Sequence, residues 1–338
     1  MRCVRGGSDI GPAVQRKGSW SMQRREFLSV AALPALAPRA DAAGPGFSWR
    51  REEESVALLR GEQVLWRLSY ARSEAKPAFH PVALPGGPIL TTFRAEDHPW
   101  HRGFWFSWKF INGVNYWEEN KAGVADGLTE IRSASVEPGP DFTAGIDLNI
   151  TYRPANSAPV LAEKRRIVIS PPGSDGVTRF DWTMRFEALE QDVLLDRTPI
   201  PGEPDGKIWG GYAGLSVRLA RDWKDARIMS NHGPLPFPDD GYRGLRPREG
   251  AIDYGGTLDG QEVGFTIIDH PSNLNSPSPW WIIDQGPMKF FNAVVIGAAP
   301  YTLKAGRGFT LRYRALTHFG RWSAERLARE LEQFGKAE

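Results

Sequence analysis

Residues 146–152 read IDLNITY, with an apolar side chain at every second position. This period of two is the pattern of a β-strand that buries one face. Clusters of turn-forming residues, such as PPGSDG at 171–176, separate this run from similar ones. The other runs are 55–59, 63–69, 166–170, 178–186, 215–219, 262–268, 290–296 and 309–316. The sequence therefore predicts an all-β antiparallel protein, a sandwich or barrel, because the helices of a parallel α/β fold are not visible.

One helix is predicted, close to residue 338. Ser323 is a suitable N-cap, and Gly335 suits the position directly after the helix. Between them an apolar stripe recurs at spacings of three, four and three, at Ala324, Leu327, Leu331 and Phe334. We expect this stripe to pack on the sheets.

The first 42 residues carry the pattern of an export signal. Arg24 and Arg25 stand before an apolar stretch, residues 27–36, that is too short to span a bilayer, which needs about 20 residues. Residues 40–42 read ADA, a small-residue cleavage site. An Arg-Arg pair before Phe-Leu is typical of the twin-arginine route. We therefore expect residues 1–42 to be an N-terminal extension and signal peptide, with Met22 as an alternative start. The twin-arginine export machinery would be a partner.

We expect the remaining residues, 43–338, to form a single β-sandwich domain that is periplasmic or secreted. Seven Lys/Arg and three Asp/Glu fall in residues 1–42, so the rest is close to neutral and gives no reason to expect a nucleic-acid partner. The one cysteine, Cys3, also falls there, which excludes a disulfide or thiolate metal site in the mature protein. No later segment is apolar for long enough to span a membrane. Two loops rich in Pro, Gly and charge, 198–206 and 231–250, are expected to border a site.

The densest group of chemically active side chains is DHPWHRGFW at 97–105. Imidazoles titrate near neutral pH and can move protons, which makes His98 and His101 candidates for acid–base roles. The indoles could stack on sugar rings. Two histidines and a carboxylate could also bind a divalent metal, but a third ligand is not evident, so no metal residue is assigned. A turn whose histidines satisfy backbone groups remains an alternative.

Two further groups hold polar residues beside predicted strands. The sequence DHPSN at 269–273 ends the strand 262–268, and either borders a site or caps the strand as a polar loop. Glu163 and Asp196 flank predicted strands and could form a carboxylate pair for sugar chemistry, unless both are simply solvated. Trp117, Glu118 and Glu119 form a less local group. No G-x-S-x-G, phosphate loop, dinucleotide fingerprint or His-Glu-x-x-His occurs.

Several of these motifs resemble a bacterial family of unknown function whose members are often labelled methane oxygenase PmoA, or PmoA-like. The motifs are KPxxHP at 76–81, DHPxHRG at 97–103, Asn112-Gly113 with Trp117, DHPxN at 269–273 with Trp280, and LRYR at 311–314. The resemblance covers about residues 48–334. Where the family commonly has His-Pro-His-His, this chain has Trp100, so an imidazole at that place is not essential here. The methane monooxygenase subunit of that name is a membrane protein, and we do not expect its activity here.

The resemblance implies an antiparallel β-supersandwich like that of galactose mutarotase, with the one C-terminal helix. This fold is shared by sugar epimerases, lyases and hydrolase accessory domains. In mutarotases a carboxylate base and a histidine acid move protons at the anomeric carbon. By analogy the acid candidates are His98, His101 and His270, and the base candidates are Glu163 and Asp196. The substrate-binding candidates are His80, Asp97, Arg102, Trp105, Trp117, Arg218, Asn273 and Trp280.

We therefore expect an exported protein that binds a carbohydrate on a concave sheet and processes it by histidine and carboxylate chemistry. The reaction would be of the epimerase, lyase or hydrolase type. One alternative is a metal-dependent β-sandwich enzyme that uses His98, His101 and a carboxylate. The other is a non-catalytic glycan-binding module, in which the aromatic residues matter and the histidines do not. The sequence names no cofactor.

Overall fold

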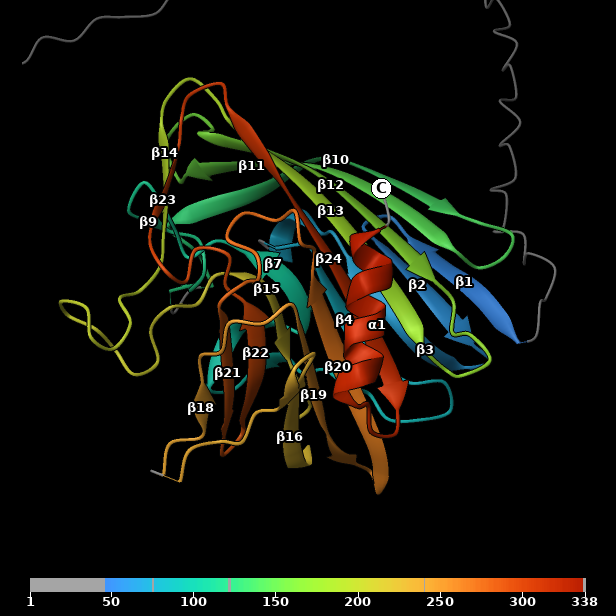
Figure 1. The fold of residues 1–338 in the computed structure, drawn as a ribbon. Coiled ribbons are helices and arrows are strands. Elements are labelled where there is room, and N and C mark those ends of the chain that lie inside the picture. The colour runs from blue at the N-terminus through green and yellow to red at the C-terminus, as the bar shows by residue number, and fades with distance from the viewer. Residues whose placement is uncertain (1–45, 75, 121–122, 240, 337–338) are drawn as a thin grey trace, which may run out of the picture. The chain divides into compact units, whose positions relative to one another are not determined.

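Two antiparallel sheets of nine strands each pack face to face with the hydrophobic core between them (Figure 1). The computed structural model describes residues 46–336, except 75, 121–122 and 240. The predicted signal segment and cleavage site lie outside the described residues, which fall within one compact unit. In the described part of the chain, no helix is long and apolar enough to cross a membrane.

The first sheet collects strands from both ends of the chain. Its order is β1 (Phe47–Glu52), β2 (Ser55–Arg60), β3 (Gln63–Ser69), β4 (Ala78–Val82), β7 (Phe104–Ser107), β15 (Gly214–Arg218), β22 (Met288–Ala293), β21 (Trp280–Gln285) and β18 (Gly244–Leu245). Strands 1 to 4 are neighbours in sequence, but β7, β15 and β22 lie side by side although long stretches of chain separate them. Side chains from distant segments therefore meet on this sheet.

The second sheet is built from longer strands. Its order is β10 (Gly127–Pro138), β11 (Ala144–Pro154), β12 (Leu161–Ser170), β13 (Thr178–Ala188), β24 (Gly308–Phe319), β20 (Gln261–Asp269), β19 (Ala251–Leu258), β16 (Lys224–Ser230) and β17 (Gly233–Pro234). Strand β24 pairs with β13 on one side and with β20 on the other. On the outer face Arg314 of β24 makes a two-pronged ion pair with Asp181 of β13, at 2.7 and 2.9 Å. Strand β24 thus joins the two halves of this sheet.

Shorter elements complete the fold. A four-stranded sheet and a two-stranded hairpin lie beside the large sheets, together with one 3₁₀ turn, η1 (Arg72–Glu74). The four-stranded sheet has the order β23 (Tyr301–Leu303), β14 (Val193–Asp196), β8 (Phe110–Ile111) and β9 (Val114–Asn115). The hairpin pairs β5 (Phe93–Ala95) with β6 (His98–Arg102).

The alternation of side chains decides which face of each strand is core. On β7, Phe104 packs against Phe180 and Phe265 of the second sheet, with ring centroids 5.7 and 5.2 Å apart. Trp105, the next residue, points to the opposite face, where it packs against His101 and Phe290. A second aromatic group therefore gathers on the face of the first sheet that is turned away from the core.

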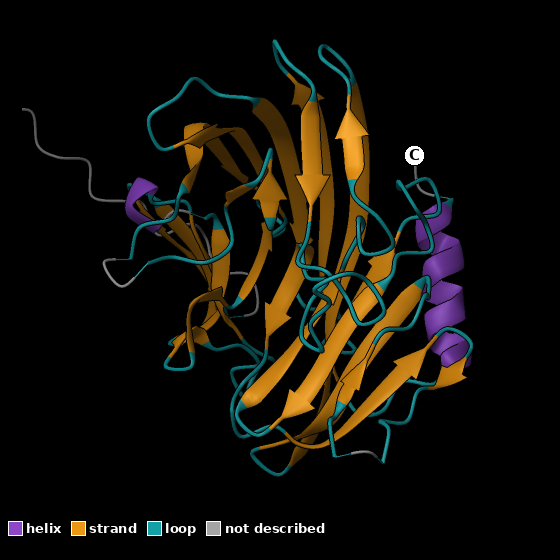
Figure 2. Ribbon diagram, turned by 90° about the vertical axis from the view of Figure 1, so that its left-hand side faces the viewer, coloured by secondary structure: helices purple, strands orange, loops and turns teal. Residues whose placement is uncertain are grey.

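The predicted helix is α1 (Ala324–Gly335), which lies along the outer side of the second sheet (Figure 2). Ser323 is its N-cap, as predicted, and accepts a hydrogen bond from Arg326 N–H. Leu327 and Phe334 are buried in a small second core against strand residues Ala251, Ile268 and Leu316. The expected helix end was wrong, because Gly335, expected at the C′ position, is still helical and Lys336, in the right-handed α region, is the C-cap. The predicted all-β antiparallel sandwich with one C-terminal helix is confirmed.

Candidate active site

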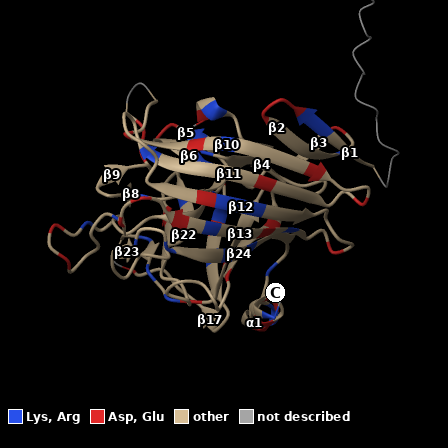
Figure 3. Ribbon diagram, turned by 90° about the horizontal axis from the view of Figure 1, so that it is seen from above, with Lys and Arg blue, Asp and Glu red and all other residues tan. Residues whose placement is uncertain are grey.

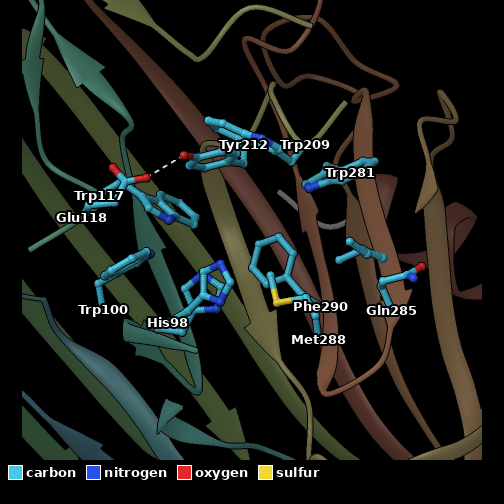
Figure 4. A pocket seen from close by; sticks show the side chains of 12 residues that line it. His98, Trp100, Trp117, Glu118, Trp209, Tyr212, Trp281, Gln285, Met288 and Phe290 are labelled. Atoms are coloured by element: carbon cyan, nitrogen blue, oxygen red, sulfur yellow. Dashed lines mark hydrogen bonds between the residues drawn. The ribbon is translucent and has the colours of Figure 1, made fainter. Parts of the chain in front are cut away.

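A cavity of about 540 Å³ lies on the outer face of the first sheet, and we call it the aromatic pocket. Its size is typical of small-molecule sites in proteins. Figure 4 shows the side chains of His98, Trp100 and Trp117 on one side and of Trp281 and Gln285 on the opposite side. The complete lining is His98, Trp100, His101, Trp117, Glu118, Trp209, Tyr212, Trp281, Ile283, Gln285, Met288 and Phe290.

Beneath the pocket the rings form a stacked layer. His101 lies flat on Phe290, with centroids 5.1 Å apart and planes at 25°. Trp105 is fully buried below both rings and does not line the cavity. Trp117 contacts Trp105 from the side at 5.6 Å. Because rigid rings support the lining from below, the pocket is largely preformed.

The first polar feature of the pocket is a histidine held by a carboxylate. Asp97 Oδ2 lies 3.0 Å from His98 Nδ1, and both Asp97 oxygens lie 2.7 Å from Arg218 Nη2. Burial raises the pKa of Asp97, but the hydrogen bond and the charge of Arg218 outweigh it, so the net pKa is lowered. The side chain of His98 is 35% exposed, so a ligand can reach it. The ionised Asp97 thus lies between this imidazole and the guanidinium of Arg218.

His101 is buried whereas His98 is partly exposed, although the two rings stack 4.8 Å apart. Burial holds the pKa of His101 well below its usual range, and the nearby His98 and Arg218 add to the effect. Its Nδ1 lies 3.5 Å from Arg218 Nη1, and a guanidinium can only donate. His101 is therefore neutral at pH 7, with its proton on Nε2, and offers the pocket a hydrogen-bonding group and not a charge.

The second polar feature is the carboxylate of Glu118, which follows Trp117 in the lining. Glu118 accepts a hydrogen bond from the Tyr212 hydroxyl at 2.5 Å, drawn as the dashed line in Figure 4, and forms an ion pair with Lys109. Burial raises the pKa of Glu118, but the charge and the hydrogen bond of Lys109 outweigh it and lower the net pKa. Burial beside this carboxylate raises the pKa of the Tyr212 hydroxyl. At neutral pH Glu118 is thus an ionised base and Tyr212 a neutral donor.

The two predicted loops both lie next to the pocket. The loop predicted at 198–206 extends to Gly211, whose N–H donates to Thr198 O at 2.8 Å, and Trp209 lies in this extension, beyond the predicted bounds. Trp209 is 48% exposed at the rim, and its ring lies 6.2 Å from that of Tyr212. The segment predicted as the loop 231–250 contains the short strands β17 and β18 and supplies Tyr242, which stacks on Trp281 with planes at 20°. Both loops therefore support aromatic side chains of the pocket.

The structure brings together only part of the predicted site. His98, His101 and Trp117 line the pocket, while Asp97, Arg218 and Trp105 stand directly behind the lining. Arg102 is fully buried and forms an ion pair with Glu119 behind Trp100 and Trp117. His80 lies outside the lining, stacked on Phe93 with its Nδ1 3.0 Å from the Thr91 hydroxyl.

His270 and Asn273 belong to another part of the molecule. His270 follows β20 in the second sheet and packs edge-on against Phe334 of α1, with centroids 5.1 Å apart. Asn273 Nδ2 donates to Asp269 and to Arg312 O, which fixes the loop after β20. The alternative of a polar loop that caps a strand describes this segment, and neither residue faces the aromatic pocket.

The two predicted base candidates and Trp280 are also placed elsewhere. Glu163 faces the core between the sheets, where it binds Arg165 and the Tyr152 hydroxyl. Asp196 ends β14 and accepts a hydrogen bond from the N–H of Arg197. Trp280 points into the core and stacks on Phe291. None of the three can contact a ligand in the aromatic pocket, since none lines it.

Sequence reasoning assigned no role to Glu118, Tyr212, Trp209 or Trp281, nor to the lining residues of β21 and β22. Glu118 carried a signal, because it follows Trp117 in one of the motifs of the resemblance. Among the described residues, no group of three or more His, Cys, Asp or Glu side chains is placed to hold a metal ion.

His80 should make the stability of the protein fall in acid. Burial lowers its pKa to about 4 from 6.5, so between these pH values only the unfolded chain binds the proton. The contribution of His80 to the free energy of unfolding is therefore fully present above pH 6.5. It decreases by about 3 kcal/mol as the pH falls towards 4. In His80→Gln, whose side chain does not titrate, we expect the fall from pH 7 to pH 4.5 to be smaller. Urea denaturation at both pH values measures this, and equal falls in the two proteins would contradict it.

Comparison with known proteins places the chain in a family and gives distant structural likenesses. The model of a family of unknown function, DUF6807, matches residues 55–332. No curated protein matches the sequence. Among solved structures the chain is similar to a putative aldose 1-epimerase from Klebsiella pneumoniae subsp. pneumoniae MGH 78578, with 9% identity, a TM-score of 0.46, and coverage of 86% of this chain and 88% of that one. It is also similar to the galactosidase domain of the α-galactosidase–sucrose kinase AgaSK, with 9% identity and a TM-score of 0.35. This second likeness covers 82% of the present chain but only 41% of the galactosidase chain.

Proposed function

The chain belongs to the family of unknown function DUF6807, so its activity has to be argued from its own pocket, and we propose that this pocket binds a carbohydrate and moves protons on it. The observation that carries the proposal is one cavity that combines aromatic sides with two held polar groups, Glu118 and His98. The finer predictions of export by the twin-arginine route and of likeness to PmoA-labelled proteins stay predictions from the sequence.

The lining suits a sugar because a sugar ring has both apolar and polar surfaces. The C–H faces of a pyranose pack well against flat indole and phenol rings, and Trp100, Trp117 and Trp209 supply such rings. Hydroxyl groups need donors and acceptors at fixed places, and a few convergent polar groups in an aromatic cavity meet that need. Gln285 and the neutral His101 are such groups besides Glu118 and His98.

The two polar groups differ in a way that fits acid–base chemistry. An ionised Glu118 can take a proton from a sugar hydroxyl or from an acidic C–H group. His98, supported by Asp97, can carry a proton and give it to a ring or leaving oxygen. In an anomeric epimerisation the first group would deprotonate the anomeric hydroxyl while the second protonates the ring oxygen. The C–O bond of the ring then breaks to give the open aldehyde, which closes again on the other face.

Thermal unfolding in the presence of mono- and oligosaccharides tests ligand binding, and a variant of Trp209 tests whether the ligand occupies this pocket. A sugar at 100 times its dissociation constant should stabilise the protein by about 2.7 kcal/mol. Trp209→Ala should lower the affinity for that sugar by about tenfold, because the ring lies at the rim of the pocket and its loss removes about 1.4 kcal/mol of stacking. Its neighbour Ile208 is 54% exposed and does not line the pocket, so Ile208→Ala is the matched control and should bind normally.

Two outcomes would change the proposal. If no sugar raises the unfolding temperature, carbohydrate recognition is wrong. If a sugar binds without turnover and His98→Ala binds it as tightly as the natural protein does, the pocket belongs to a non-catalytic glycan-binding module.

A further inference from the structure

Three charged side chains are buried together behind the aromatic pocket, and we call them the Lys76 cluster: Lys76, Glu119 and Arg102. Their side chains are only 1%, 3% and 0% exposed. Glu119 Oε1 lies 2.5 Å from Arg102 Nη2 and 3.5 Å from Lys76 Nζ. Burying three charges costs free energy, and a well-packed apolar group of the same size often serves stability as well. The cluster therefore calls for an explanation other than stability.

Several hydrogen bonds of the cluster go to the backbone of the two segments that form one side of the pocket, besides a contact of Arg102 with Glu74. Lys76 Nζ donates to Trp117 O at 2.6 Å and reaches Trp100 O at 3.5 Å. Arg102 Nη1 donates to Pro99 O at 2.6 Å. The cluster thus connects the segment that carries His98 and Trp100 to the segment that carries Trp117 and Glu118.

These two segments receive little support from the sheets. Residues 116–120 lie in no strand. Strand β6, residues 98–102, pairs only with the short strand β5 among the described residues. Neither segment is fixed by the ladder of a large sheet, so side-chain hydrogen bonds contribute to fixing their positions, beside the backbone bonds of Tyr116 and Asn120 at the ends of the second segment.

We propose that Lys76 and Glu119 are positioning residues of the site: they hold the His98–Trp100 and Trp117–Glu118 segments at the separation that a ligand requires. The inference rests on the proposed function, because it assigns these residues to the same pocket. Burial lowers the pKa of Lys76 to about 8, and Glu119 acts against this shift. The ammonium group is therefore still mostly protonated at pH 7 and keeps all three donors for the carbonyls and Glu119.

The test is Lys76→Met, which removes the ammonium group and keeps most of the stem. Backbone hydrogen exchange should become faster in residues 97–102 and 116–120 and stay unchanged in β11 to β13. For the sugar identified by thermal unfolding, the dissociation constant of the folded protein should rise by about tenfold or more. Glu163→Gln is the matched control. It disturbs an equally buried ion pair in the core, so it should lower the unfolding temperature without changing exchange in the two segments or the affinity for sugar.

Unchanged exchange in both segments of Lys76→Met would overturn the inference, as would an equal loss of affinity in Glu163→Gln. If Lys76→Met does not fold, Glu119→Gln makes the same test, because it removes the charge that binds Arg102 and Lys76. If the natural protein binds no sugar, the proposed function fails alone, since the exchange measurement needs no ligand.

Discussion

Glu118→Gln is expected to lower kcat by about 10²- to 10⁴-fold, the usual contribution of a general base. Glutamine keeps the size of the side chain and can still accept the hydrogen bond of Tyr212, but it cannot take a proton. The loss should therefore fall on kcat and leave KM for the sugar little changed. Steady-state kinetics on the sugar identified by thermal unfolding measure both constants.

The chain offers an unusually close control for this variant. Glu163 also binds one tyrosine hydroxyl and one cation, Tyr152 and Arg165, but it is fully buried and faces the core, whereas Glu118 is half-buried and faces the pocket. Glu163→Gln makes the same chemical change against the same kinds of partner and should leave kcat per folded molecule unchanged. Normal turnover in Glu118→Gln, or an equal loss in the two variants, would remove Glu118 from the reaction.

Arg165→Met is expected to lower the free energy of unfolding by about 3–5 kcal/mol, because it leaves the charge of Glu163 buried without a partner. Arg165 and Glu163 are both fully buried, with two hydrogen bonds at 2.5 and 3.0 Å between them. The guanidinium also lies over the rings of Phe106 and Trp182, at 5.7 and 5.4 Å. Denaturation by guanidinium chloride measures the loss.

The neighbouring residue supplies the control, since β12 carries three consecutive basic residues after Glu163 (Figure 3). Arg166 points to the outer face and forms an exposed ion pair with Asp147. Arg166→Met should cost no more than about 1 kcal/mol. Adding Glu163→Leu to Arg165→Met should recover much of the lost stability, because no buried charge then remains. A cost for Arg165→Met no larger than that for Arg166→Met would contradict the prediction.

The fold could be predicted because it depends on local patterns. The alternation at 146–152 and the similar runs each mark one strand, and the stripe after Ser323 marks the helix. The order of the strands could not be predicted in this way. Alternation shows that a strand has a buried face, but not that β7 lies beside β15 and β15 beside β22.

The site was predicted less completely, because it depends on the order of the strands. It also depends on which face of a strand each residue occupies, and this changes from one residue to the next. Trp280 and Trp281 are adjacent tryptophans, and a shift of one residue exchanges core for pocket. The sequence prediction took Trp280, whereas Trp281 lines the cavity. Glu163 was predicted as a base, although it shares the parity of Leu161 and Ile167 and so falls on the buried face of β12. The alternation along β12 could therefore have placed Glu163 on the buried face. For the two tryptophans, only the structure shows which one faces the pocket.

The position of β24 also governs the order in which the chain can fold as it is synthesised. Residues 308–319 lie in the middle of the second sheet, and the ion pair between Asp181 and Arg314 joins residues 133 positions apart. While the ribosome is still adding the residues before 308, β13 and β20 have no strand between them, and both expose a long unpaired edge. Such edges pair readily with other chains, so this is the period in which we expect aggregation. A nascent chain held by a chaperone until residue 319 has emerged would avoid it, and a fragment that contains β20 but stops before residue 308 would keep both edges open.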